Sequence, residues 1–212
     1  MVRPDLDTIC SVHGLSLFPP TKKVRMTLAN NGVHLDNIEE LVNLIKSDPR
    51  FAQVKFSAKS RWLGGTRTEV TVSQIQAGGE TISNPDRQFT LQVDEPEQLG
   101  GTDQAPGPIE YLAAGLCGCL SAGIATNAAL FKTALDKIEI EVEMDYDLNN
   151  ILAVDRSGPQ NVTELRYTVR LGGPAPKEDQ VRAKHTLDGK SPVRKTLELP
   201  LKVVHTDVSV DE

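Results

Sequence analysis

The sequence predicts an α+β fold, in which antiparallel strands and helices occupy separate stretches of the chain. Segments of alternating apolar and polar residues lie before and after one long apolar stretch at 109–131. The resulting order of strands, buried helix, strands, helices and strand differs from the repeating βαβ pattern of a parallel sheet. The 39% hydrophobic and 25% charged residues of the 212-residue chain are ordinary for a globular protein.

The N-terminal quarter of the chain is weakly patterned. We assign residues 1–50 to an N-terminal extension and residues 51–212 to one domain. Within the extension, apolar residues recur at helical spacing over 37–45, Asp36 can cap the start, and Pro49 ends the segment. The sequence therefore predicts one amphipathic helix in the extension.

Strand patterns follow this helix. Apolar and polar residues alternate over 54–58 and again over 69–75, on either side of a Gly64–Gly65 turn, which predicts a hairpin. A third strand is expected at 87–93, where every second residue from Phe89 onward is apolar. The next segment, up to the first proline of the apolar stretch, is rich in Gly, Pro and Asp, and we interpret it as a functional loop.

The apolar stretch predicts a helix from about 108 to 133, with Pro108 in the first turn, where its missing N–H costs nothing. Its length would also allow a membrane span. It carries the polar residues Glu110, Thr126 and Asn127 among others, and no second stretch of this kind exists to partner it. We therefore expect a buried helix and no membrane.

Strands and helices follow the long helix. Alternating residues predict the strands, and a Ser191–Pro192 pair supplies an N-cap and first turn for a short helix. The strands are expected at 137–147, 164–171 and 199–208, and the helices at 177–187 and 191–197.

Charge and cysteine content limit the class of protein. The net charge is −6, which opposes both a nucleic-acid binder and attraction to anionic membranes. Three cysteines, Cys10, Cys117 and Cys119, are too few for a secreted disulfide framework, and no charged-then-apolar leader opens the chain. We expect a cytoplasmic protein without nucleic-acid or membrane partners.

The two cysteines of the long helix are the candidates for chemistry. Cys117 and Cys119 are two positions apart, so about 200° separates them around a helix and they cannot face one pocket. A cysteine on an apolar helix is more often an inert core residue than a nucleophile. The CxC spacing lacks a second ligand pair, and the histidines are scattered, so we expect no metal and no cofactor.

Four segments of the chain form a larger pattern. The first is Pro108-x-Glu110-x-Leu112-Ala113-Ala114-x-x-x-x-Cys119 after a Gly-rich loop; the others are Arg61-Trp62-x-Gly64-Gly65-x-Arg67, the strand at 135–143, and Ser191-Pro192-Val193-x-x-Thr196-Leu197. In this order they resemble the reactive-cysteine helix, the arginine hairpin, the following strand and the second-cysteine motif of the OsmC/Ohr hydroperoxide-reductase family. The resemblance spans residues 54–208.

The resemblance has implications for fold and chemistry. It implies a two-lobed α+β fold, with antiparallel sheets around a long central helix, built as an intertwined homodimer with sites at the subunit interface. It implies thiol-dependent reduction of organic hydroperoxides in oxidative-stress defence. Cys119 would be the nucleophile, Arg67 its activator, with Arg61 as the alternative, and Glu110 a support for the arginine.

The sequence departs from the family at two positions. The second cysteine of the family falls on Ser191, so the usual intramolecular disulfide cannot form, and a one-cysteine cycle with an external thiol reductant is implied. Glu110 lies nine residues before Cys119, where the family glutamate usually lies ten before. A first-turn acid that complements the helix dipole is an equally good interpretation of Glu110.

These departures leave two alternatives to the reductase open. The first is a catalytically silent OsmC-like protein that binds a small molecule in the same interface pocket. The second is a structural or partner-binding domain in which both helical cysteines belong to the core.

Overall fold

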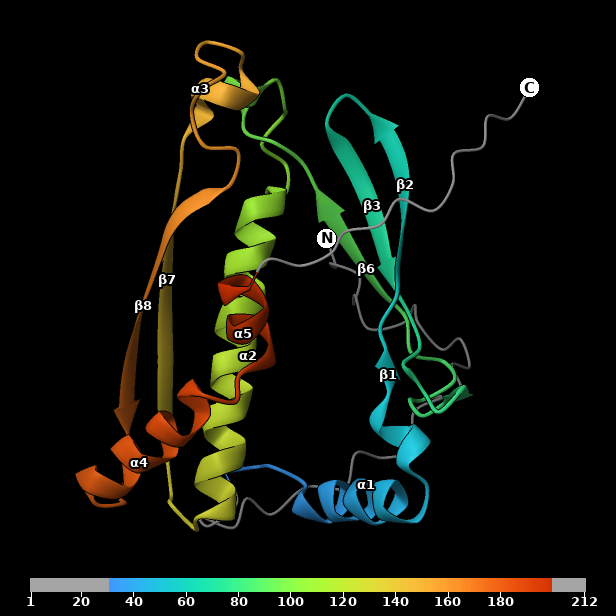
Figure 1. The fold of residues 1–212 in the computed structure, drawn as a ribbon, viewed down its shortest axis with the longest axis vertical. Coiled ribbons are helices and arrows are strands. Elements are labelled where there is room, and N and C mark those ends of the chain that lie inside the picture. Colours follow the sequence, from blue (N-terminus) through green and yellow to red (C-terminus); the bar gives the residue numbers. More distant parts are fainter. Residues whose placement is uncertain (1–30, 200–212) are drawn as a thin grey trace, which may run out of the picture.

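The computed structural model describes residues 31–199 and has the predicted α+β architecture, with antiparallel sheets and one long helix (Figure 1). Helix α2 (Pro108–Leu130) stands in the middle of the molecule. The hairpin β7–β8 lies along one side of α2, and the sheet β2–β3–β6 stands on the other side (Figure 1). We call residues 35–93 the N-lobe and residues 108–198 the C-lobe.

The N-lobe begins with helix α1 and the 3-10 turn η1 and continues into two small antiparallel sheets. The helical segments are α1 (Leu35–Ser47) and η1 (Pro49–Ala52). The first sheet has the order β1–β4–β5, with β1 (Val54–Lys55), β4 (Gln76–Ala77) and β5 (Glu80–Thr81). The second has the order β2–β3–β6, with β2 (Ala58–Gly64), β3 (Arg67–Val72) and β6 (Phe89–Val93).

The predicted N-lobe strands differ in detail from the observed ones. The expected hairpin is β2–β3, and the third strand begins at Phe89. The alternation at 54–58 does not belong to one strand, because β1 and β2 lie in different sheets. Strands β4 and β5 were not predicted, since two residues carry no readable alternation.

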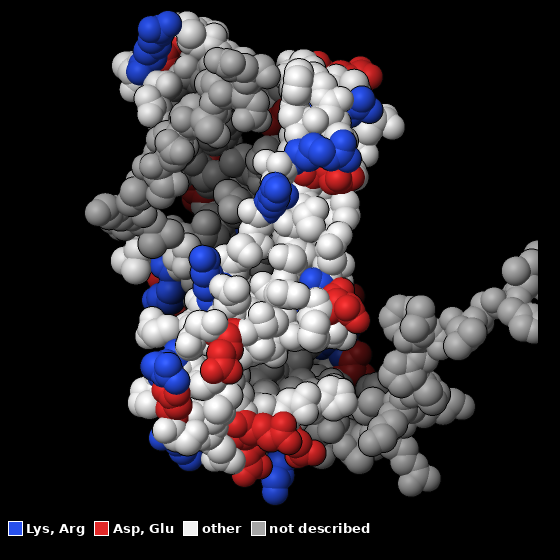
Figure 2. All heavy atoms as spheres, turned by 90° about the vertical axis from the view of Figure 1, so that its right-hand side faces the viewer, with Lys and Arg blue, Asp and Glu red and all other residues white. Residues whose placement is uncertain are grey.

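One face of the sheet β2–β3–β6 is apolar and largely uncovered. The register places Trp62 opposite Thr68 and Val70 opposite Leu91, and directly opposite residues share a face. The apolar members of this face are Ala58, Trp62, Val70, Val72, Phe89, Leu91 and Val93. Trp62 is 71% exposed and Phe89 56% exposed, so the face is not part of a core within the described subunit. On the side of the molecule that carries the N-lobe, broad uncharged areas separate small groups of charged side chains (Figure 2).

The C-lobe elements that follow α2 agree with the predicted order. They are β7 (Lys137–Tyr146), α3 (Leu148–Ile151), β8 (Val162–Gly172), α4 (Lys177–Asp188) and α5 (Pro192–Glu198). The single turn α3 was not predicted, because four residues are too few to show a helical period. Apart from Leu199, the expected strand at 199–208 lies outside the described residues.

The core lies between α2 and the C-lobe. Leu116, Leu120 and Ile124 recur every four positions on α2, and each is at most 1% exposed. They pack with Leu187 of α4 and with the inner side chains of β7 and β8. Gly123 makes room for this contact, because a Cβ there would lie 2.5 Å from a methyl carbon of Leu187. The outward side chains of β7 and β8 are polar and form ion pairs in water.

Another face of α2 is uncovered. Leu112 is 47% exposed, and Gly115, Gly118 and Ala122 are exposed at helical spacing on the same stripe. A Cβ built on Gly115 or Gly118 meets no atom within 4 Å. Among the described residues, α2 is the one helix long and apolar enough to cross a membrane, which is weak evidence for a span. The sequence predicted a buried helix, whereas α2 packs against β7, α4 and α5 and leaves another face exposed.

Candidate functional site

Cys119 contacts the first residue of the α5 segment. Its Sγ lies 3.2 Å from Oγ of Ser191, a residue 72 positions away in the sequence. Cys119 is half-buried, whereas Ser191 is fully buried. Ser191 is the N-cap of α5, and its Oγ accepts a hydrogen bond from the backbone N–H of Arg194 at 3.3 Å. The fold thus brings together the two positions that hold the cysteine pair in the OsmC/Ohr pattern.

Cys117 lies in a different environment. Its Sγ is 3.9 Å from the backbone carbonyl of Ile140 on β7, a weak contact at most. Both cysteines are free thiols. The two side chains therefore contact different elements, as their separation around the helix predicts, and only Cys119 borders the uncovered stripe of α2.

Glu110 lies at the start of α2 and caps it. Its carboxylate Oε2 accepts a hydrogen bond from the backbone N–H of Gly107 at 2.6 Å. This contact satisfies a free helix donor, and the charge complements the helix dipole. Nine residues at about 1.5 Å each place Glu110 roughly 13 Å along the helix from Cys119. Within one subunit, Glu110 is too far away to contact the Cys119 thiol.

The two hairpin arginines have different surroundings. Arg61 pairs with Glu69 at 3.0 Å on the polar face of the sheet. Arg67 begins β3 and is exposed. In the described chain, no hydrogen bond or ion pair joins Arg67 to Cys119 or Glu110. The single subunit therefore does not assemble the three predicted site residues into one cluster.

Asp94 is a structural hub that the sequence did not single out. It is 1% exposed, and its carboxylate accepts hydrogen bonds from the hydroxyls of Thr66 at 2.5 Å and Thr102 at 2.6 Å. The carboxylate also accepts hydrogen bonds from the backbone N–H groups of Glu95, Thr102 and Gln104. The bonds from Thr102 and Thr66 hold the pKa of Asp94 well below its ordinary value, although burial opposes this.

The hub connects the arginine hairpin to the loop before α2. Thr66 is next to Arg67, and Thr102 lies in the Gly-rich segment that leads to Glu110. The loop itself is tightly folded, since a Cβ on Gly101 would lie 1.7 Å from the carbonyl oxygen of Glu95. In the sequence, Asp94 stands at the start of the Gly-rich loop and Thr102 follows within that loop. This combination is the signal that could have revealed the network.

A cavity of about 600 Å³ adjoins the first turn of α2. The loop before α2, the helix start and α3 each contribute to its walls. Its apolar lining consists of Pro96, Leu99, Ala105, Pro108, Ile109, Tyr146, Leu148, Ile151 and Leu152, and its carboxylates are Glu95, Asp103 and Glu110. Apolar walls with a few polar groups are typical of a small-molecule pocket.

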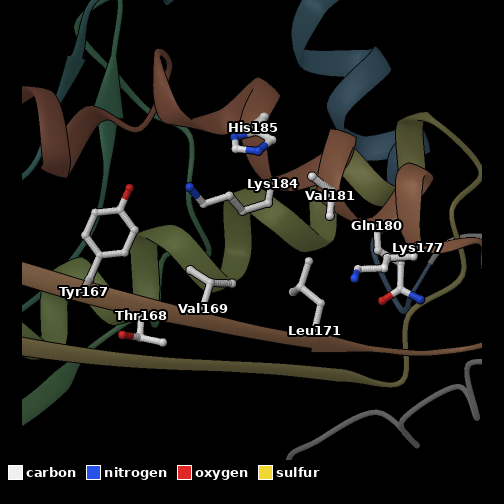
Figure 3. Close-up of a pocket in the computed structure, with 9 residues that line it drawn as sticks. All are labelled: Tyr167, Thr168, Val169, Leu171, Lys177, Gln180, Val181, Lys184 and His185. Atoms are coloured by element: carbon white, nitrogen blue, oxygen red, sulfur yellow. The ribbon is translucent and has the colours of Figure 1, made fainter.

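A second cavity, of about 510 Å³, lies between β8 and α4 (Figure 3). In this view Val181 of α4 lies over Leu171 of β8, and Lys184 of α4 lies over Val169 with its amine toward Tyr167. Two of the basic side chains in its lining have a partner: Lys184 and the His185 ring contact Asp188 at 2.7 Å and 3.2 Å.

The groups around Asp188 affect the pKa of its carboxyl group. Burial opposes ionisation of Asp188, but the hydrogen bonds from Lys184 and His185 keep its pKa below the ordinary value. The lining of the cavity between β8 and α4 includes neither Cys119 nor Ser191, so we assign this cavity no role in the chemistry of Cys119. In the part of the chain that the structure describes, no group of three or more His, Cys, Asp or Glu side chains is arranged to hold a metal ion.

The chain is similar to known proteins in sequence and in fold. The family described as OsmC-like protein matches residues 101–206 of the chain. A similar solved structure is the OsmC-like protein from Mycoplasma pneumoniae, with 14% identity, a TM-score of 0.51, and coverage of 68% of this chain and 87% of that one. Another is an organic hydroperoxide resistance protein OsmC from Legionella pneumophila, with 20% identity, a TM-score of 0.45, and coverage of 68% and 88%. No curated protein is significantly similar in sequence.

Proposed function

Because this chain belongs to the OsmC-like protein family, we propose that it reduces organic hydroperoxides with Cys119 as the nucleophile. The observation that carries the proposal is the 3.2 Å contact between Cys119 and Ser191. It puts a half-buried thiol beside the position from which the family's second cysteine acts. The same contact restricts the cycle to one cysteine, because a serine oxygen cannot form the disulfide.

The proposed reaction has two stages. The Cys119 thiolate attacks one oxygen of the hydroperoxide, the S–O bond forms, the O–O bond breaks, and the departing alkoxide takes up a proton to become an alcohol. The sulfenic acid then reacts with an external thiol, which releases water and forms a mixed disulfide. A second external thiol attacks this disulfide, which restores Cys119 and leaves the reductant oxidised.

We propose that the active form is a homodimer. The subunit leaves two apolar surfaces uncovered, the face of β2–β3–β6 and the small-residue stripe of α2. Exposed apolar patches of this kind mark interaction sites. A second copy is the partner that supplies both surfaces at once, since a two-fold dimer can place one on the other twice.

The dimer also accounts for the distant site residues. Glu110 lies roughly 13 Å along α2 from Cys119 of its own chain, by the rise of the helix. The Asp94 network fixes the turn next to Arg67 to the same end of the molecule. We therefore propose that Arg67, supported by Glu110, serves the Cys119 thiolate of the partner subunit, where a guanidinium favours the charged sulfur.

Mixed dimers test this arrangement. Cys119→Ser and Arg67→Ala homodimers should each be inactive or strongly impaired. After subunit exchange, a random mixture should regain roughly a quarter of the wild-type activity, because half of the dimers then hold one intact site. An impaired Arg61→Ala homodimer that recovers in the same mixture, in place of Arg67→Ala, would assign the role to Arg61. No recovery with either arginine variant would contradict a site shared between subunits.

The reaction itself is tested by turnover and by mass. Steady-state assays with cumene and tert-butyl hydroperoxides and several thiol donors should show reduction that Cys119→Ser abolishes and Cys117→Ser leaves intact. After one equivalent of hydroperoxide without reductant, intact-mass analysis should show one added oxygen at Cys119, trapped by dimedone. A loss of two hydrogens at a cysteine pair would contradict the one-cysteine cycle.

A binding protein without turnover is the second candidate. Two observations favour it: Ser191 replaces the family's second cysteine, and Arg67 does not contact Cys119 within the described subunit. In that case the cavity beside Glu110 would hold the small molecule. Slow alkylation of Cys119 at neutral pH, together with an unmodified mass after hydroperoxide treatment, would select this function. For either function we propose a cytoplasmic location, which suits free thiols.

A further inference from the structure

The Ser191 hydroxyl has two polar neighbours in the part of the chain that the structure describes. Its oxygen accepts a hydrogen bond from the backbone N–H of Arg194, with an N–O distance of 3.3 Å, and lies 3.2 Å from Cys119 Sγ. A serine hydroxyl has one proton to donate and two lone pairs that accept. Because the Arg194 N–H occupies one lone pair, the hydroxyl proton is left for the sulfur.

The direction of this hydrogen bond depends on the ionisation of Cys119. A thiol can either donate to Ser191 or accept from it. A thiolate has no proton, so Ser191 must then donate. Hydrogen bonds to a charged acceptor are stronger than neutral ones. The contact therefore stabilises the thiolate more than the thiol, which is the state that attacks a hydroperoxide.

We propose that Ser191 is a further catalytic residue, whose hydroxyl donates to the Cys119 thiolate. This role rests on the proposed hydroperoxide reduction. In the family pattern, a cysteine at this position attacks the sulfenic acid. The serine of this chain cannot do so, and instead its hydrogen bond stabilises the Cys119 thiolate before the S–O bond forms. The sulfenic acid is then reduced by an external thiol.

The surrounding structure holds the hydroxyl in place. The backbone N–H of Ser191 donates to the carbonyl of Leu187 at 3.0 Å, and Leu187 packs in the core against α2. The side chain of Ser191 is 0% exposed and also caps α5. A donor fixed in this way needs no rearrangement when charge appears on the sulfur.

Alkylation of the two helical thiols tests the role apart from turnover. Iodoacetamide rates at Cys119 and Cys117 are measured from about pH 5 to 9 by mass spectrometry with fragmentation of the shared peptide. The variants are Ser191→Ala and Ser191→Gly, which remove the hydroxyl, and Ser191→Thr, which keeps it. Glycine is the better match, because it retains most N-cap stability. Thr186→Ala, which removes a hydroxyl that bonds only within α4, is the control.

Loss of the donor should move the midpoint of the Cys119 profile upward by about one pH unit, so that alkylation at neutral pH slows roughly tenfold. Ser191→Thr should restore the wild-type profile, and Thr186→Ala and the Cys117 rates should not change. Wild-type profiles in both Ser191→Ala and Ser191→Gly would overturn the inference and reduce Ser191 to an N-cap.

The outcome is separable from that of the proposed function. A shifted profile in a protein that does not reduce hydroperoxides would sustain the hydrogen bond and refute the reaction. An unshifted profile in an active reductase would sustain the reaction and refute the role of Ser191.

Discussion

The two larger antiparallel arrangements of this subunit follow the same alternating pattern but differ in what covers them. The inner side chains of β7 and β8 pack on α2, and their outer side chains form ion pairs in water. The sheet β2–β3–β6 also separates apolar from polar residues, yet its apolar face leaves Trp62 71% exposed and Phe89 56% exposed. The apolar face of β7–β8 is therefore covered within the subunit, whereas the apolar face of β2–β3–β6 is not.

This difference bears on where the function resides. Cys119 lies at the border between the two situations: Ser191 covers one side of the thiol, and the uncovered stripe of α2 runs along the other. A chain folded only for its own stability would bury the apolar face of β2–β3–β6 against a helix of its own. Leaving both this face and the stripe of α2 open is what a site completed by a second subunit would require.

The largest expected effect is loss of the dimer in Gly115→Arg. The wild type should have close to twice the 23.1 kDa chain mass by light scattering at micromolar concentration. A Cβ at Gly115 meets no atom within 4 Å, so the subunit should fold while a bulky charge blocks the stripe. Gly189→Arg, in similarly open space at the C-cap of α4, should remain a dimer. A wild-type monomer would contradict the shared site as well.

The core between α2 and the hairpin β7–β8 should lose stability when a single buried side chain is shortened. Leu120 is 1% exposed in the core between α2 and the hairpin, so Leu120→Ala should lower the free energy of unfolding by about 2–5 kcal/mol. Val154→Ala, at a side chain that is 75% exposed, should stay within about 0.5 kcal/mol of the wild type. Urea denaturation gives both values, and similar losses in the two variants would show that α2 and β7–β8 are not the core.

Most of the regular structure could be predicted from the sequence, because long strands and α2 repeat their pattern over many residues. The two-residue strands β1, β4 and β5 and the single turn α3 could not, since two to four residues are too few to show a strand or helix period. Periodicity could not pair Cys119 with Ser191 either, and only the family resemblance brought these positions together. The Asp94 network depends on two threonines 36 positions apart (Thr66 and Thr102), a relation that no local pattern contains.

The connection between the β2–β3 turn and the loop before α2 should depend on pH through Asp94. Its folded pKa is lowered by the threonine hydrogen bonds, so ionised Asp94 stabilises the fold above its unfolded pKa of about 3.9, and this stabilisation is lost as the pH falls further toward the folded pKa. Asp94→Asn should therefore unfold at lower urea than the wild type near pH 7, and the gap should narrow below about pH 4. The exposed carboxylate variant Asp36→Asn is the control. A gap that stays constant down to pH 2 would show that the charge of Asp94 does not matter.

The smallest expected effect is that of Phe89→Ala in a monomeric subunit. It shows whether the exposed side chain of Phe89 packs on a second copy or within its own subunit. In the Gly115→Arg background, Phe89 is 56% exposed, so its removal should change the free energy of unfolding by no more than about 0.5 kcal/mol. In the dimer the same side chain should be covered by the partner, so Phe89→Ala should weaken association and make the denaturation midpoint fall more steeply on dilution. The measurement is a urea titration at several protein concentrations in both backgrounds. Equal losses in the two backgrounds would mean that Phe89 packs within its own subunit, and the apolar face of β2–β3–β6 would then not be the surface that receives a second copy.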